Sequence, residues 1–134
     1  MNPVRKTQFL TFPTLHEDLG VEVTLISELE QLTHSFKFRA AWNVVSSVAA
    51  EHFLAASSGN FGQALACAAK LKGKGCTIVM PANSAKVKIA AVRSHGAKVE
   101  LVETTKISRA QRVAEIASQN PTYYIASAYD CPHV

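Results

Sequence analysis

The sequence predicts an α/β fold in which an open parallel sheet of about four strands carries helices on its faces. Short apolar runs alternate with helical patterns from about residue 51 onward, and a turn signal follows each helical pattern. This alternation indicates right-handed β-α-β units. The chain has 134 residues, 48% hydrophobic and 18% charged, so it is long and apolar enough to bury a core.

The repeating part of the chain is expected to contain four strands and three helices. The strands are expected at 53–57, 76–80, 97–102 and 122–126, and the helices at 60–72, 84–94 and 108–118. Gly73, Gly96 and the pair Asn120-Pro121 end the three helices.

The first part of the chain does not share this repeat and is expected to belong elsewhere, with a second sheet. Residues 1–11 are expected to be an irregular lead-in, followed by a short helix over 12–20. A strand is expected over 21–28, a loop over 28–35 and a helix over 36–48, in which apolar residues recur at helical spacing.

Charge and cysteine content argue against several classes of function. The net charge is +4, but the basic residues are scattered without interleaved aromatics, so nucleic-acid binding is not expected. Cys67, Cys76 and Cys131 lack metal-ligand spacing, so we expect no metal site and read Cys67 and Cys76 as buried free thiols in a reducing compartment. The sequence has no signal-peptide pattern or membrane-length apolar stretch, which predicts a soluble cytoplasmic protein without membrane contact.

A turn rich in small residues joins the first strand of the series to an alanine-rich helix. It reads Ser57-Ser58-Gly59-Asn60-Phe61-Gly62. Glycine lets a backbone approach a ligand closely, and the first turn of a helix offers N–H groups to an anion. Serine and asparagine are also ordinary helix caps, so the turn alone leaves both interpretations open.

Lys37 is the best candidate for a reactive group facing this turn. It stands in the first turn of an expected helix, between Phe36 and Phe38. The helix dipole and apolar neighbours both disfavour a positive charge there, which favours a neutral amine that can attack an aldehyde. The alternative is a lysine whose side chain passes the phenylalanines into water.

Together the two segments resemble a known family. The segment Ser35-Phe36-Lys37-Phe38-Arg39-Ala40-Ala41 is similar to the Ser-Phe-Lys-x-Arg-Gly-Ala motif that carries the Schiff-base lysine of fold-type II pyridoxal phosphate enzymes. The turn with Gln63 resembles the Ser-Ser-Gly-Asn-His-Gly-Gln loop of that family. Further ordered matches follow at 77–81, 86–88 and 95–99, and the resemblance extends from about Val21 to Val134. The serine/threonine dehydratases and serine racemases are the most similar subgroup.

The resemblance implies roles around the cofactor, pyridoxal 5'-phosphate. Lys37 would hold the cofactor, and would then take and return the substrate α-proton. Phe36 would pack beside the cofactor ring, and Asn60 would hydrogen-bond its 3′-hydroxyl.

The resemblance also implies a substrate site on the same turn. Ser57, Gly59, Asn60 and the backbone around Phe61 would hold the carboxylate of a small amino acid. Ser58 matches the position of a second acid/base in racemases, and a plain cap hydroxyl is the equal alternative.

The implied activity is that of a dehydratase (ammonia-lyase) or racemase acting on small hydroxy amino acids. The implied organisation is 1–50 as the N-terminal part of the large, lysine-bearing domain and 51–134 as the small α/β domain. A β-replacing threonine or cysteine synthase remains an alternative. So does a non-catalytic truncated module whose exposed apolar surface would favour a homo-oligomer.

Three departures from the family pattern matter. Ala40 replaces a glycine, and Phe61 replaces a histidine near the substrate, which leaves the substrate open. The segment 129–134 resembles the one just before the family motif Ile-Ala-Gly-x-Gly-Thr, whose phosphate loop would lie beyond it. The chain by itself is therefore expected to be incomplete for catalysis and to bind the cofactor weakly.

Overall fold

A computed structural model describes residues 2–129 and 132–133, so Cys131 lies outside the described residues. The elements, in chain order, are β1 (Gln8–Thr11), α1 (Pro13–Leu19), β2 (Thr24–Ser27), α2 (Lys37–Ser47), β3 (His52–Ala56), α3 (Asn60–Leu71), β4 (Gly75–Pro81), α4 (Lys86–Ser94), β5 (Lys98–Val102), α5 (Arg109–Gln119) and β6 (Tyr124–Ile125). Within this described part of the chain, no helix combines the length and apolarity needed to cross a membrane.

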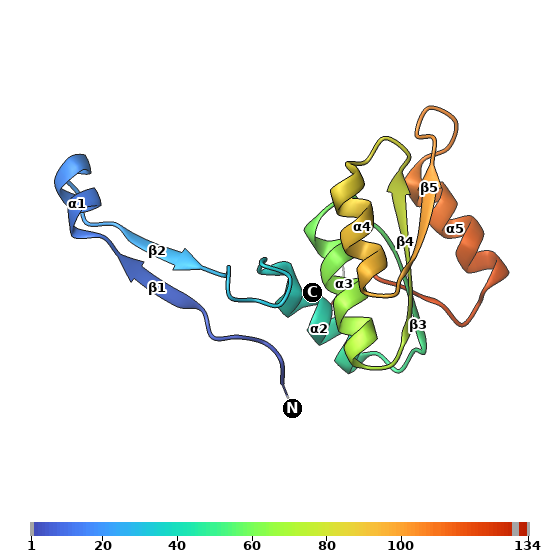
Figure 1. Cartoon of the computed structure of the whole chain (residues 1–134). Coiled ribbons are helices and arrows are strands. Elements are labelled where there is room, and N and C mark those ends of the chain that lie inside the picture. Colours follow the sequence, from blue (N-terminus) through green and yellow to red (C-terminus); the bar gives the residue numbers. More distant parts are fainter. Residues whose placement is uncertain (1, 130–131, 134) are drawn as a thin grey trace.

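The main sheet has four parallel strands in the order β5-β4-β3-β6, which confirms the expected fold class. Helices α3 and α4 cover one face and α5 covers the other (Figure 1). The last strand is shorter than expected: only Tyr124 and Ile125 pair, opposite Phe53 and Leu54 of β3. All seven expected elements of this region are present, with bounds shifted by a few residues.

The core is divided between the two faces of the sheet. Along β3, Phe53 and Ala55 belong to the larger cluster under α2, α3 and α4, whereas Leu54 belongs to the smaller cluster that includes Val113 of α5. This follows from the alternation of side chains along a strand. Because both faces are covered, β3 reads as a continuous apolar run.

Helix α2 packs against α3 and ties the first part of the chain to the sheet. Its buried residues are Phe38, Ala41, Val44 and Val45. At its C-terminal end, the Lys74 Nζ donates to backbone carbonyl oxygens of α2 and its cap, at 3.3 Å and 3.1 Å. A cation on terminal helix carbonyls is favourable because those carbonyls lack partners within the helix.

The first strands form a separate antiparallel hairpin that projects from the rest of the molecule (Figure 1). The expectation of an irregular lead-in over 1–11 was wrong, because Gln8–Thr11 is β1 and pairs with β2. The strand expected over 21–28 is reduced to Thr24–Ser27. Both strands have four residues and are almost wholly exposed, so β1 lacks the half-buried alternation that identifies a strand in sequence.

A polar network anchors the base of this hairpin to α2. The Arg39 guanidinium binds both carboxylate oxygens of Glu28, with Nε to Oε2 at 2.8 Å and Nη2 to Oε1 at 3.0 Å. The buried Gln31 exchanges two hydrogen bonds with the backbone of Arg5, at 3.0 Å and 2.7 Å. The hydrogen bond from Arg39, followed by that from Thr7, lowers the pKa of Glu28 from 4.5 to about 2.

The turn between β3 and α3 is held by a serine rather than by an ordinary cap. The Ser57 Oγ accepts from the N–H of Gly62 at 2.9 Å, and from that of Gly59 at 3.4 Å. Gly62 is enclosed, since a Cβ there would lie 3.1 Å from Ile78 Cγ2 and 3.1 Å from Ser57 Cβ. The turn therefore depends on a residue without a side chain at position 62.

The Glu28 network predicts an acid-sensitive hairpin anchor. Because the folded-state pKa is lowered, the carboxylate stabilises the fold above the ordinary value of 4.5 and this contribution is lost as the pH falls toward about 2. We expect the free energy of unfolding to fall more steeply over that pH range in the native chain than in Glu28→Gln. Urea unfolding at several pH values measures this, with the exposed Glu22→Gln as control. Equal slopes for Glu28→Gln and the native chain would contradict the assignment.

The turn predicts that Gly62→Ala is more damaging than Gly59→Ala. The methyl group at 62 would press on Ile78 and Ser57, whereas one at 59 would meet nothing within 4 Å. Overpacking of this kind costs about 1–3 kcal/mol in the free energy of unfolding. Thermal and denaturant unfolding of the two variants would show the difference, and equal losses would refute the enclosure of Gly62.

Candidate active site

A cleft of about 420 Å³ lies at the carboxyl end of β3, where ligands bind in open α/β sheets. All seven residues singled out from the sequence line it, which brings together two segments about 20 positions apart in the chain. They are Phe36, Lys37, Ser57, Ser58, Gly59, Asn60 and Phe61. The structure establishes their proximity, while their individual roles stay predictions.

Lys37 is the first residue of α2, and its side chain reaches across to the segment after β6. The Nζ donates to the carbonyl oxygen of Ala128 at 3.2 Å. It also lies 5.1 Å from the centre of the Phe36 ring and 5.4 Å from that of Tyr129. Lys37 is thus half-buried and lines the cleft, with its Nζ hydrogen-bonded to the Ala128 carbonyl.

The two phenylalanines beside Lys37 have opposite environments. Phe38 is fully buried in the core and fixes the helix, whereas Phe36 is 58% exposed and lines the cleft. The sequence argument treated both as apolar neighbours that disfavour charge. The Phe36 ring instead lies where its face attracts an ammonium group.

The serine turn leaves several polar groups unused. Ser57 is buried and its oxygen is engaged by the turn, whereas Ser58 is half-buried and the Asn60 side chain is exposed. Among the described residues, the N–H groups of Asn60 and Phe61 at the start of α3 have no acceptor. These groups can therefore bind an anion that enters the cleft.

Phe61 contributes backbone rather than side chain to the cleft. Its ring is 4% exposed and belongs to the larger core cluster. The histidine-to-phenylalanine departure therefore places an apolar group in the core.

Five further residues line the cleft that were not expected from the sequence. They are Ala56, Lys88, Arg109, Ala128 and Tyr129. The order of the strands brings the ends of β3 and β6 together, but no local motif marks these positions. Only the placement of Lys88 and Arg109 in the first turns of helices that follow parallel strands could have indicated them.

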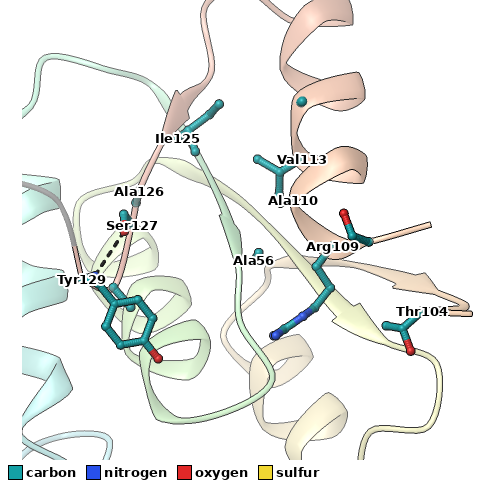
Figure 2. A pocket seen from close by; sticks show the side chains of 12 residues that line it. Ala56, Thr104, Arg109, Ala110, Val113, Ile125, Ala126, Ser127 and Tyr129 are labelled. Carbon is teal, nitrogen blue, oxygen red and sulfur yellow. Dashed lines mark hydrogen bonds between the residues drawn. The ribbon is translucent and has the colours of Figure 1, made fainter.

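A second cavity of about 670 Å³ adjoins the first and shares Ala56, Arg109, Ala128 and Tyr129 with it. Figure 2 shows Arg109 leaving the start of α5 toward the side of the cavity where Tyr129 lies. The described residues of the lysine cleft include three cationic side chains, Lys37, Lys88 and Arg109, and no carboxylate. This charge distribution favours an anionic ligand.

Comparisons with known proteins point to one family. A family described as pyridoxal-phosphate dependent enzyme matches residues 1–134. The serine racemase of Schizosaccharomyces pombe is 35% identical over 133 residues, which cover 96% of this chain and 41% of the relative. The L-threo-3-hydroxyaspartate ammonia-lyase of Saccharomyces cerevisiae is 35% identical over 135 residues, covering 98% of this chain and 41% of the relative.

Comparison with solved structures points to the same family. The crystal structure of serine racemase from Dictyostelium discoideum superposes with a TM-score of 0.86 at 31% identity, covering 96% of this chain and 43% of that one. The chain thus spans about two fifths of the length of the proteins it matches. The match of the whole chain to the family, and the lysine and serine-turn motifs meeting in one cleft, confirm the resemblance seen in the sequence. The chain belongs to the pyridoxal-phosphate dependent enzymes.

Proposed function

We propose that this chain supplies the lysine and the substrate-binding turn of an ammonia-lyase or racemase that acts on small hydroxy amino acids. The observation that carries the proposal is the meeting of the Lys37 amine and the Ser57–Phe61 turn in one cleft. The names of the two relatives support the same reaction classes. Because the chain spans 41% of those relatives, the activity of the whole protein is part of this proposal.

The residues in the cleft fit pyridoxal phosphate. An amine, an exposed aromatic ring and an exposed carboxamide stand together, from Lys37, Phe36 and Asn60. When bound, pyridoxal phosphate supplies an electron sink for a carbanion at the substrate α-carbon. Lys37 would hold the cofactor and move the α-proton, Asn60 would hydrogen-bond the ring hydroxyl, and Phe36 would pack beside the ring.

The start of α3 would hold the substrate carboxylate. The N–H groups of Asn60 and Phe61, which have no acceptor among the described residues, would form the anion-binding end of the helix. Gly59, just before the helix, leaves open space where a side chain would stand. The carboxylate would therefore be bound mainly by backbone, which suits any small α-amino acid.

Ser58 would decide between the two reaction classes. Racemisation requires a proton donor besides Lys37, whereas elimination of a β-hydroxyl can proceed with the lysine as the only base at the α-carbon. The Ser58 side chain lines the cleft and makes no hydrogen bond to the described residues. This leaves its hydroxyl available as the proposed second acid/base, and the hydroxyl that binds the backbone N–H of Gly62 in this turn is that of Ser57.

The added cations suggest a substrate with a second carboxylate. Lys88 and Arg109 line the same cleft as Lys37, and they come from different helices. A charged hydrogen bond to a β-carboxylate would favour a hydroxyaspartate over serine. The name of the Saccharomyces cerevisiae relative is consistent with such a substrate.

We also propose the organisation and surroundings of the chain. Residues 1–50 would form part of a large domain and 51–134 the small domain, in line with the separate hairpin and four-stranded sheet.

The hairpin exposes large apolar side chains, such as Phe9 at 67% and Ile26 at 68%, which would favour self-association. The free, buried thiols of Cys67 and Cys76 suit a reducing, cytoplasmic setting.

Reductive trapping tests the role of Lys37. We expect added pyridoxal phosphate, followed by borohydride, to modify Lys37 in preference to the other lysines, because this amine lies in the cleft 5.1 Å from the centre of the Phe36 ring. Peptide mass spectrometry measures the modified fraction at each lysine, even where binding is weak. Lys37→Arg should abolish the selective product, and Lys88→Arg, in the same cleft, should retain it. Modification spread evenly over all lysines would contradict the proposal.

Amide NMR spectroscopy tests the second carboxylate. We expect L-threo-3-hydroxyaspartate to shift the signals of Asn60 and Phe61 at lower concentration than L-serine. Arg109→Gln should weaken binding of hydroxyaspartate by about 10- to 100-fold, since a hydrogen bond to a charged group contributes about 1.5–3 kcal/mol. Binding of serine should change little. An equal loss for both ligands would assign Arg109 to the fold rather than to selectivity.

A further inference from the structure

The second cavity lies between α5 and β6, beside the lysine cleft, and we call it the α5 cavity. Its volume is about 670 Å³, within the range of about 300–1,000 Å³ that is usual for small-molecule sites. Apolar side chains make up most of its lining. Figure 2 shows Val113 of α5 and Ile125 of β6 at the end of the cavity away from the Tyr129 ring.

The cavity exists because α5 leaves part of its face of the sheet uncovered. Ile125 pairs with Leu54 of β3, so the two side chains lie on the same face. Leu54 is fully buried in the cluster that includes Val113, whereas Ile125 is 49% exposed. Helix α5 therefore does not reach across this face as far as β6, and an apolar wall is left open to a ligand.

Arg109 gives the α5 cavity a charged end. Its guanidinium forms no ion pair or hydrogen bond with the described residues, in contrast to those of Arg39 and Arg112. No carboxylate is present among the described residues that line the cavity. Figure 2 shows the Arg109 side chain extending from α5 toward the Tyr129 ring, away from the apolar end. A cationic end and an apolar end in one cavity fit a ligand that combines a carboxylate with an apolar group.

We propose that the α5 cavity binds a monocarboxylate with a bulky apolar tail. The carboxylate pairs with Arg109, and the tail lies against Val113 and Ile125. The cationic side chains of the adjoining lysine cleft add to the attraction for an anion.

The ligand also affects the lysine cleft, because Arg109 lines both cavities. A guanidinium that is paired with a carboxylate in the α5 cavity is withheld from a carboxylate in the cleft. The monocarboxylate therefore weakens the binding of a dicarboxylic substrate and spares that of serine, and by linkage the dicarboxylate weakens the monocarboxylate equally. This antagonism rests on the proposed role of Arg109 in substrate binding, whereas the α5 cavity itself does not.

Methyl NMR spectroscopy of Val113 and Ile125 tests the site, with 3-phenylpropanoate as the probe. The phenyl ring supplies the tail, and its ring current shifts the signals of the methyl groups that it contacts. The matched controls are 3-phenylpropan-1-ol, which lacks the charge, and propanoate, which lacks the ring. We expect 3-phenylpropanoate to shift both residues at a concentration at least about tenfold lower than either control, because it alone makes both contacts. Equal midpoints for the three ligands would overturn the proposal.

Two variants separate the charge from the apolar contact. Arg109→Gln should weaken binding of 3-phenylpropanoate by about 10- to 100-fold and leave that of 3-phenylpropan-1-ol unchanged. Ala114→Phe, from an exposed lining position of α5, should fill the cavity and abolish the response of Ile125 to the probe. Gln119→Phe, at the exposed last residue of the same helix and outside the cavity lining, should match the native chain.

Two results from these variants and controls would refute the site. One is undiminished binding of 3-phenylpropanoate in Arg109→Gln or Ala114→Phe. The other is a shift of the Val113 and Ile125 signals with protein concentration alone, which would assign the cavity to a contact between copies of the chain.

Competition tests the shared arginine. With 3-phenylpropanoate at saturation, we expect the midpoint for L-threo-3-hydroxyaspartate, measured at the Asn60 and Phe61 amides, to rise at least about tenfold. The midpoint for L-serine should stay unchanged. An unchanged midpoint for hydroxyaspartate would overturn the antagonism, and an equal rise for serine would place the probe in the lysine cleft instead. If hydroxyaspartate shifts neither amide even without the probe, the proposed function fails, and the response of Val113 and Ile125 still decides the α5 cavity.

Discussion

The packing of α2 against α3 is the constraint on which the candidate site depends. Lys37 opens α2 and the serine turn opens α3, so the two halves of the cleft meet only if the helices keep their contact. Phe38, directly after the lysine, is fully buried in that contact, and Lys74 closes the far end of α2. The core therefore fixes the backbone of Lys37, while the Lys37 side chain contacts groups in the cleft.

The sheet and part of the cleft could be predicted from the sequence, whereas β1 and several residues that line the cleft could not. The difference has physical reasons. Strands β3 and β4 are buried on both faces, so their apolar runs, and the helical pattern of α3 between them, can be recognised in the sequence. The hairpin is exposed and its strands are short, so β1 could not be distinguished from a lead-in. Lys37 and the turn formed recognisable motifs. Arg109 and Tyr129 reach the cleft only through the strand order, which no local pattern encodes.

The hairpin is held in place mainly by the ion pair of Arg39 with Glu28, whereas the sheet is stabilised by buried apolar side chains. Two exposed strands of four residues are marginal by themselves, so their position must come from the base of the hairpin. There the planar guanidinium of Arg39 meets both oxygens of Glu28, and the buried Gln31 ties down the preceding backbone. Arg39 lies on the same helix as Lys37, two positions along the chain. The anchor of the hairpin and the Lys37 amine, for which we propose the cofactor-holding role, therefore share one helical turn.

Within the short turn from Ser57 to Gly62, some side chains stabilise the fold and their neighbours face the cleft. Ser57 uses its oxygen to hold the turn, and Phe61 uses its ring to fill the core. Ser58 and Asn60, which lie between them in the chain, have side-chain polar groups with no hydrogen-bond partner among the described residues. Gly62 permits the close approach that this arrangement needs, since a Cβ would press on Ser57. Ser57, Phe61 and Gly62 thus stabilise the fold, and Ser58 and Asn60 remain available to a ligand.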